Sequence, residues 1–218
     1  MTIEWIAHSC FKITLEDGRV ILFDPFDSAI GYTMPEISAD VVLISHDHYD
    51  HNCTDSLRGD YVLIREAGVT ELDGIRIEGI PTYHDHEKGA KRGRDMMFKV
   101  TAEGLNLLHM GDVGEVPDEA LLEKIGAVDI LFIPVGGVYT IDAEEALETC
   151  KRIDPNIIVP MHYKTLFLTL DIDPVFKFTD AAGRYYDRSR LGGSSFSITS
   201  GDKKKRTRIM VMENSLEG

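Results

Sequence analysis

Short apolar runs separated by turn signals recur along the chain, and this pattern predicts a strand-rich fold. Asp17-Gly18, Asp73-Gly74 and Glu103-Gly104 each stand between two such runs and predict tight hairpin turns. We expect strands over residues 2–6, 10–15, 19–23, 41–44, 61–65, 68–72, 75–80, 96–101, 105–108, 128–135 and 156–160, and a last hairpin made of 194–199 and 206–212.

Helical patterns occur chiefly in the second half of the chain. We expect helices over 117–125, 143–153 and 173–182, and a short one at 55–57. Asp142 and Glu145 occupy the positions of a capping box. The order of many strands, helix, strand and helix hints at two similar halves, but no linker divides the chain. We therefore expect a single domain of mixed α/β (α+β) class over residues 1–218.

Composition narrows the possible classes of function. Hydrophobic residues make up 43% of the 218 residues and charged residues 28%, which is near the average of globular proteins. The formal net charge of −14 would repel a nucleic-acid backbone, so we expect a small or metal-anchored substrate and no nucleic acid. A run of basic residues lies in the last predicted hairpin, and we interpret it as the solvated tip. It consists of Lys203, Lys204, Lys205, Arg206 and Arg208.

The expected compartment is the cytoplasm, without a membrane partner. No apolar run approaches the roughly 20 residues that a membrane helix needs. The first residues lack the basic segment of a secretion signal. Cys10, Cys53 and Cys150 are odd in number and widely separated, which fits a reducing compartment. The oligomeric state stays open.

Potential metal ligands are most concentrated in residues 45–52, directly after the apolar run 41–44. His46 and His48 are two apart in a segment that leaves a strand, so both can point to one zinc-like ion. Asp50 and His51 follow at once, and a tight turn would send them to a neighbouring ion, as in two-metal hydrolytic sites. The alternative is a polar loop whose histidines are merely solvated.

Three later strand ends carry further candidate ligands. The run 75–80 leads to His84 and His86, and we favour His84 for the first ion because it comes first after the strand. Asp112 is suited to bridge two cations, although it can also cap a turn. His162 follows the strand at 156–160 and completes the set for the second ion. His109 is left as a core or supporting residue.

Other polar residues have two possible roles. Asp24 either forms a turn or holds a ligand histidine in its tautomer, and His8 is either structural or part of the site. Residues 87–95 are expected to form a mobile loop with Gly89 and Gly93 as hinges. The loop carries four cations, which either bind an anionic group of a substrate or are solvated. They are Lys88, Lys91, Arg92 and Arg94.

The order of these residues resembles the metallo-beta-lactamase superfamily of binuclear hydrolases. The motif H-x-H-x-D-H at 46–51 is followed by His84, Asp112 and His162, each after a predicted strand. The segments 5–11, 23–25, 109–112 and 160–163, together with His84-Asp85 and its Gly89 and Arg92-Gly93, are similar to a small branch of Zn-dependent hydrolases that is itself similar to L-ascorbate-6-phosphate lactonase. The resemblance implies a four-layer αββα sandwich with the metals at one edge of two sheets.

The resemblance also implies a ligand set and an activity. One divalent ion would be held by His46, His48 and His84, the other by Asp50, His51 and His162, with Asp112 between them. The ions would be Zn²⁺, with Mn²⁺ or iron as alternatives. A metal-bound hydroxide would attack an ester, lactone or phosphoester bond of a small anionic metabolite, and Asp50 and Asp112 are the catalytic candidates.

Residues outside the ligand set would hold the negative part of the substrate. The candidates are Lys88 and Arg92, or Tyr163 and Lys164. Two alternative functions are a phosphodiesterase or nuclease of the same superfamily, and a metal-binding module without turnover. Only about fifty residues separate Asp112 from His162, which leaves no room for the large inserted domain of the superfamily's RNA-processing nucleases.

Overall fold

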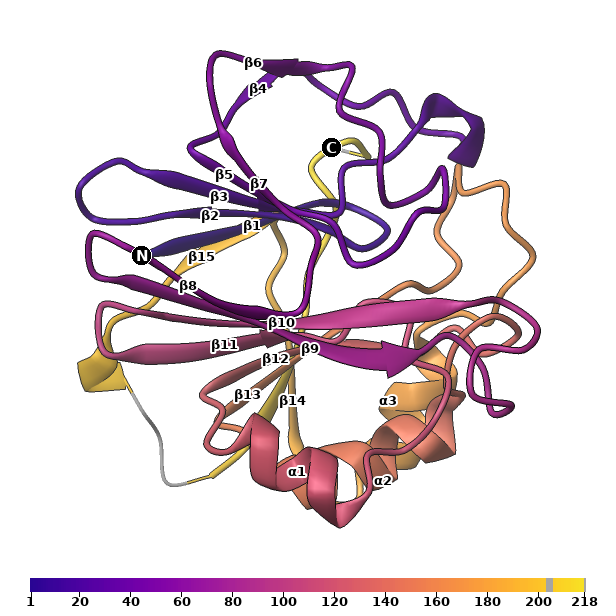
Figure 1. Cartoon of the computed structure of the whole chain (residues 1–218). Helices are drawn as coiled ribbons and strands as arrows, with labels where there is room; N and C mark the ends of the chain where they lie inside the picture. Colours follow the sequence, from indigo (N-terminus) through magenta and orange to yellow (C-terminus); the bar gives the residue numbers. More distant parts are fainter. Residues whose placement is uncertain (203–205, 218) are drawn as a thin grey trace.

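Two β-sheets pack face to face in the computed structural model, which describes residues 1–202 and 206–217. Helices cover the outer side of one sheet, and a thinner layer covers the outer side of the other (Figure 1). The two sheets share one core, so these residues form a single domain. The predicted fold class is confirmed.

The first sheet has six strands in the order β15-β1-β2-β3-β5-β7. β1, β2 and β3 are joined as antiparallel neighbours, and β5 and β7 extend the sheet in parallel to β3. In the order of the sheet, the bounds are Ser195–Ser197, Thr2–Ala7, Cys10–Thr14, Val20–Phe23, Val41–Leu43 and Val62–Ile64.

The second sheet has eight strands in the order β14-β16-β13-β12-β11-β10-β9-β8. The strands β8 to β11 form an antiparallel meander, whereas β11, β12, β13, β16 and β14 run parallel. In the order of the sheet, the bounds are Asp187–Arg190, Arg208–Val211, Ile157–Met161, Ile130–Pro134, Leu105–His109, Arg94–Ala102, Ile75–Tyr83 and Gly68–Leu72.

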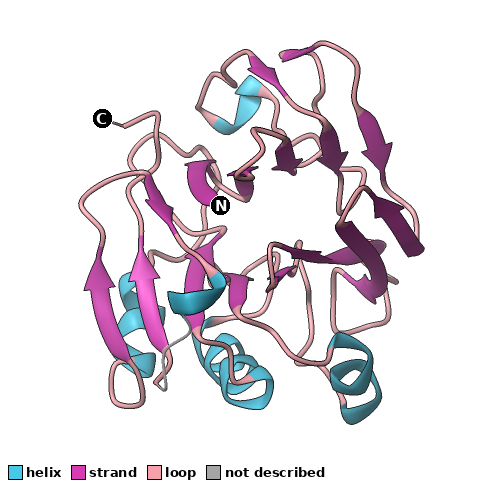
Figure 2. Cartoon of the chain, turned by 90° about the vertical axis from the view of Figure 1, so that its left-hand side faces the viewer, coloured by secondary structure: helices cyan, strands magenta, loops and turns pink. Residues whose placement is uncertain are grey.

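Helices lie on the outer side of the eight-stranded sheet, as Figures 1 and 2 show: α1 (Glu119–Ile125), α2 (Ala143–Ile153) and α3 (Phe176–Ala182). The predicted capping box begins α2, because Asp142 accepts from the backbone N–H of Glu145 and the Glu145 carboxylate accepts from that of Asp142. No helix in the described part of the chain is long and apolar enough to span a membrane.

A thin layer covers the outer side of the six-stranded sheet. It contains the 3-10 turn η1 (Ser28–Ile30) and a small parallel sheet of β4 (Ile37–Ser38) and β6 (Leu57–Arg58). Its apolar residues, such as Phe26 and Ile30, pack on Leu22 and Val42 of the sheet. A second 3-10 turn, η2 (Ser200–Asp202), follows β15.

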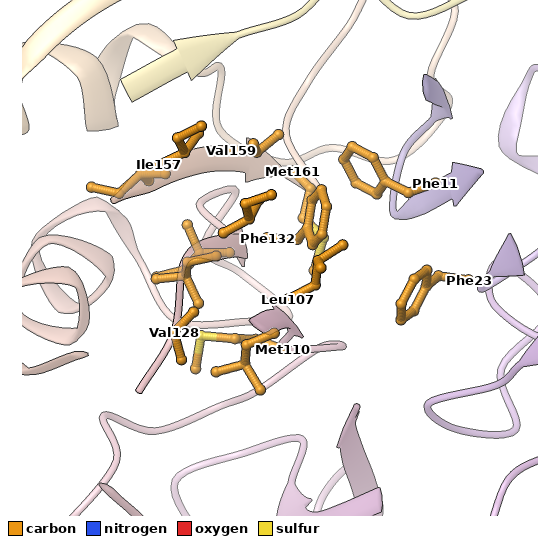
Figure 3. Close-up of a cluster of buried hydrophobic side chains, with 14 of the residues drawn as sticks. Phe11, Phe23, Leu107, Met110, Val128, Phe132, Ile157, Val159 and Met161 are labelled. Carbon is orange, nitrogen blue, oxygen red and sulfur yellow. The ribbon is translucent and has the colours of Figure 1, made fainter. Parts of the chain in front are cut away.

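Aromatic and aliphatic side chains fill the space between the two sheets (Figure 3). Phe11 and Phe23 extend from β2 and β3, and the ring of Phe132 on β12 lies 4.5 Å from that of Phe11. All three are fully buried. Burial of such a ring contributes about 3–5 kcal/mol to folding, judged from truncation to alanine. These contacts fix the two sheets relative to each other.

The strand directions bring several loops to one edge of this sandwich. β1, β3 and β5 run in the same direction, so their carboxyl ends meet at one edge of the first sheet. β9, β11, β12 and β13 likewise end at one edge of the second sheet. The predicted ligands follow these ends, at His8, Asp24, 46–51, His84, Asp112 and His162.

Two predictions about secondary structure are wrong. The strands at 194–199 and 206–212 do not form a hairpin, because β15 pairs with β1 in one sheet and β16 pairs with β13 and β14 in the other. The predicted short helix at 55–57 is absent from the described structure, because residues 55 and 56 form a turn and Leu57 begins β6. The basic residues Lys203, Lys204 and Lys205 of the predicted hairpin tip lie outside the described residues.

Candidate metal centre

Three histidines form the first group of converging ligands: His46, His48 and His84. His46 and His48 leave the end of β5, and His84 leaves the end of β9 in the opposite sheet. His84 Nδ1 donates to the carbonyl oxygen of Tyr139 at 3.0 Å, which leaves the lone pair of Nε2 directed inward. His86 lies elsewhere, with its exposed ring 3.5 Å from the Glu145 carboxylate.

The second group contains four buried residues: His8, Asp50, His51 and His162. The sequence did not decide between a structural role and a site role for His8. The structure places it in this group. Its Nε2 lies 3.2 Å from Asp50 Oδ2, and its ring lies 4.2 Å from the ring of His162. Burial, followed by the nearby His162, lowers the pKa of His8 to about 4, so its imidazole is neutral at pH 7.

Asp112 lies between the two groups. Its Oδ2 is 3.3 Å from His84 Nε2 and 3.1 Å from His162 Nε2, and its Oδ1 is 3.3 Å from His51 Nε2. The carboxylate is buried and follows β11 through a short turn. A single carboxylate therefore contacts imidazoles of both groups.

The turn that delivers Asp112 consists of Met110 and Gly111, which follow the end of β11. Gly111 has φ of +56°, and a Cβ there would lie 2.4 Å from Asp95 Oδ1, so only glycine suits this position. His109 stabilises the same turn, since its Nδ1 accepts from the backbone N–H of Gly111 and its Nε2 donates to Ser9 O. His109 is therefore a structural residue that joins the two sheets.

Asp24 holds His51, one of the candidate ligand histidines. Its Oδ2 lies 2.8 Å from His51 Nδ1, and it also accepts from the backbone N–H and the hydroxyl of Ser45, both at 2.7 Å. Because the Ser45 proton goes to Asp24, the Ser45 oxygen can accept from His46 Nδ1 at 2.9 Å. Both His46 and His51 thus direct Nε2 toward the centre.

Asp95 is a residue of the site that sequence reasoning missed. It stands at the start of β10, is 1% exposed, and its Oδ1 lies 3.3 Å from His46 Nδ1. The same oxygen accepts from the backbone N–H of Asp112 at 3.2 Å. A single aspartate after a basic loop carries no signal of this role in the sequence, because both of its partners come from distant segments.

The backbone is strained at three of these residues. His8, Asp24 and His162 have φ of 55°, 44° and 50°, in the left-handed region that residues with a side chain rarely adopt. The backbone of His8 is held by two contacts, because its carbonyl oxygen accepts from Trp5 Nε1 at 3.0 Å and from the His162 N–H at 3.3 Å. Such strain is typical of functional sites.

The donor set fits divalent metal ions. The Nε2 atoms of His46, His51 and His162 and Oδ1 of Asp112 are buried and have no hydrogen-bond partner in the described part of the chain. Buried polar atoms without a partner are costly, so a convergent set of them fits the binding of a cation. Neutral imidazole with carboxylate suits zinc, manganese or iron.

Comparison with known proteins identifies the family. The family model described as a beta-lactamase superfamily domain matches residues 2–162. The chain belongs to the metallo-beta-lactamase superfamily. A UPF0173 metal-dependent hydrolase of Thermoplasma acidophilum is 32% identical over 198 residues, which cover 77% of this chain and 85% of the relative. The chain is accordingly a metal-dependent hydrolase.

Solved structures agree with this assignment. A candidate Zn-dependent hydrolase of the superfamily from Thermotoga maritima is 34% identical, with a TM-score of 0.81 and coverage of 98% of this chain and 99% of that one. A diiron beta-hydroxylase from Streptomyces venezuelae is 13% identical, with a TM-score of 0.65 and coverage of 98% and 52%. The second likeness shows a shared fold alone.

A pocket of about 510 Å³ opens beside the candidate metal ligands. His48, His84, Asp50 and Asp112 line it together with Asp47, Tyr49, Lys91, Arg92, Tyr139 and Leu170. A molecule in this pocket would therefore reach both the candidate ligands and the cations Lys91 and Arg92. The volume lies in the range of small-molecule pockets.

Two predicted substrate-binding residues lie away from this pocket. Tyr163 is buried against Trp5, with ring centroids 5.2 Å apart. The Lys164 ammonium donates to the carbonyl oxygens of Leu168 and Leu170 at 2.5 and 2.8 Å. Tyr163 thus contributes to packing, and Lys164 holds the segment that carries Leu170. Neither side chain lines the pocket.

The loop after His84 is held by one carboxylate. Asp85 is buried and accepts from the backbone N–H groups of four residues, namely Glu87, Gly89, Lys91 and Arg92. Burial opposes its charge, but these four donors hold the pKa of Asp85 down to about 2. The loop that the sequence suggested to be mobile is therefore a hydrogen-bonded turn.

Proposed function

We propose that this hydrolase uses two divalent ions, preferentially Zn²⁺. His46, His48 and His84 would hold one ion, Asp50, His51 and His162 the other, and Asp112 would lie between them. The observation that carries this proposal is the Asp112 carboxylate, which contacts imidazoles of both groups at 3.1 to 3.3 Å. His8 would support the second group through its contact with Asp50.

The proposed reaction is the hydrolysis of an ester, lactone or phosphoester bond. Bound divalent ions would supply a hydroxide nucleophile near neutral pH and Lewis acidity for the bond that is cut. Asp50 lines the pocket and is the proposed proton relay to the leaving group. Its contact with His8 at 3.2 Å orients the carboxylate for this role.

The proposed substrate is a small anionic metabolite. The pocket of about 510 Å³ accommodates a small molecule, and Lys91 and Arg92 line its rim. The net charge of −14 disfavours a nucleic acid as the substrate. A salt-dependent gel shift with RNA would count against this part of the proposal.

The test combines metal content with activity. The purified protein and the Asp112→Asn variant would be loaded with Zn²⁺, dialysed, and analysed for metal per chain by elemental analysis. Both would then be assayed with a generic ester and a generic phosphodiester. We expect two ions per wild-type chain, and in the variant a loss of at least one ion with a fall in rate of about a hundredfold or more.

A matched control removes an exposed carboxylate that lies away from the candidate ligands. Asp60 is exposed and precedes β7, at the edge of the sheet opposite the ligands, so Asp60→Asn should keep both ions and the full rate. One ion per wild-type chain at full activity would contradict the binuclear proposal. Equal rates in wild type and Asp112→Asn would contradict the catalytic role of the cluster.

A further inference from the structure

One guanidinium stands at the rim of the metal pocket. Arg92 lines the same pocket as the ligands His84 and Asp112. Its Cζ lies 5.3 Å from the ring centroid of Tyr139, which also lines the pocket. A guanidinium stacked on an aromatic face keeps its N–H groups, which lie in its own plane, available for an acceptor.

Arg92 differs from the other cations of its loop. Lys91 is paired with Glu87 at 2.5 Å, so its charge is already compensated. Lys88 and Arg94 are exposed and do not line the pocket. Within residues 1–202 and 206–217, no carboxylate pairs with the Arg92 guanidinium, although the chain carries a net charge of −14. In so acidic a protein, a guanidinium without an acidic partner indicates an external anion.

The backbone holds Arg92 in place. The Asp85 carboxylate accepts from the Arg92 N–H at 2.7 Å, and Asp85 directly follows the ligand His84. Gly89 approaches Gly93 so closely that a Cβ at Gly89 would lie 2.7 Å from the Gly93 oxygen. The turn therefore fixes Arg92 relative to His84, and an anion bound to Arg92 would have a defined position relative to the reacting centre.

We propose that Arg92 binds a carboxylate or phosphate group of the substrate, at a position separate from the bond that is hydrolysed. The substrate is then a small ester, lactone or phosphoester that carries an additional acidic group. This inference rests on the proposed function and deepens it. Arginine suits this role because its planar fork makes two parallel hydrogen bonds to either anion.

The first experiment compares two esters on the metal-loaded enzyme. 4-Nitrophenyl benzoate is neutral, and mono-4-nitrophenyl terephthalate carries a separate carboxylate that cannot attack its own ester. We expect wild type to prefer the terephthalate ester in kcat/KM, and Arg92→Gln to lower that preference roughly ten- to hundredfold through KM. Arg92→Lys should retain part of the preference. Arg76→Gln, which removes an exposed arginine at the opposite edge of the sheet, should leave it unchanged.

The second experiment measures binding without turnover. Succinate and glycerol 3-phosphate would be titrated calorimetrically into metal-loaded wild type and Arg92→Gln, and the anion whose affinity falls more in the variant is the group that Arg92 binds. Equal affinities of both anions in the two proteins would overturn the inference. So would metal-dependent hydrolysis of both esters with the same preference in both proteins, although the proposed function would then stand.

The two proposals fail in different ways. If neither ester is hydrolysed by the metal-loaded wild type, the result counts against the proposed reaction for such esters. The calorimetric comparison still decides the role of Arg92 in that case. A fall in anion affinity in Arg92→Gln would support the anion site even then.

Discussion

Replacing Asp24 by asparagine should selectively weaken the second metal site. The Asp24 carboxylate uses one oxygen for the Ser45 N–H and the other for the Ser45 hydroxyl and His51 Nδ1. An amide has only one acceptor oxygen. In one orientation its NH₂ group faces His51 Nδ1, and in the other it faces the Ser45 N–H, so either orientation places two donors together.

The expected magnitude follows from the tautomer of His51. With its proton on Nδ1, His51 directs a lone pair at Nε2 toward Asp112 and the proposed ion. If the amide faces Nδ1, the other tautomer is favoured and Nε2 carries the proton, which blocks metal binding. Loss of a carboxylate that orients a ligand histidine typically lowers metal affinity about 10- to 100-fold, which corresponds to about 1.4 to 2.7 kcal/mol.

The assay is a calorimetric titration of Zn²⁺ into metal-free protein, with elemental analysis after dialysis. Asp24→Asn should weaken one of two binding events by this amount and affect the other less, since Asp24 reaches the first group only through Ser45 and His46, and His46 Nδ1 also lies 3.3 Å from Asp95 Oδ1. The exposed Asp60→Asn serves as the control. Two binding events of wild-type affinity in Asp24→Asn would refute the assignment of Asp24 as the residue that orients His51.

Other parts of the structure lead to four further predictions. Asp95→Asn should lower the affinity for the ion at His46 about tenfold while the circular dichroism spectrum stays unchanged, and an unaltered affinity would contradict its role. Chelation should abolish hydrolysis and lower the Tm, because it leaves buried ligand atoms without a partner; an unchanged Tm would indicate that no ion stabilises the fold. Phe132→Ala should lower the free energy of unfolding in urea by about 3–5 kcal/mol, and a loss below about 1 kcal/mol would show that the ring is not central to the core. Asp142→Ala should cost about 1 kcal/mol in the same assay through the lost cap of α2, whereas no change would contradict the capping box.

The sequence predicted most of the strands because their signals are local. Alternating apolar residues and the Asp-Gly turns at 17–18 and 73–74 specify hairpins between neighbouring runs, as in β2–β3 and β8–β9. The prediction of the last hairpin was wrong because it also relied on local signals. Its two strands look like neighbours in sequence, but Ser197 pairs with Thr2 and Arg208 pairs with Ile157, and such distant partners leave no local signal.

The candidate ligands could be identified from the sequence because each follows a strand closely. The residues that support them were harder to identify. Asp85 is a buried carboxylate that accepts from backbone N–H groups of its own loop, and Asp95 is one whose partners, the Asp112 N–H and His46, come from other segments. Nothing in their residue type or spacing distinguishes them from surface aspartates. His8 needed the structure as well, because its place in the cluster depends on contacts with Asp50 and His162.

The order of the strands also has a consequence during translation. His162 follows β13, which lies between β12 and β16, and β16 comes from residues near the end of the described chain. A nascent chain that has emerged as far as His162 still lacks the neighbour on one side of that strand. Stable uptake of metal at the second group should therefore wait until the segment that forms β16 has been synthesised.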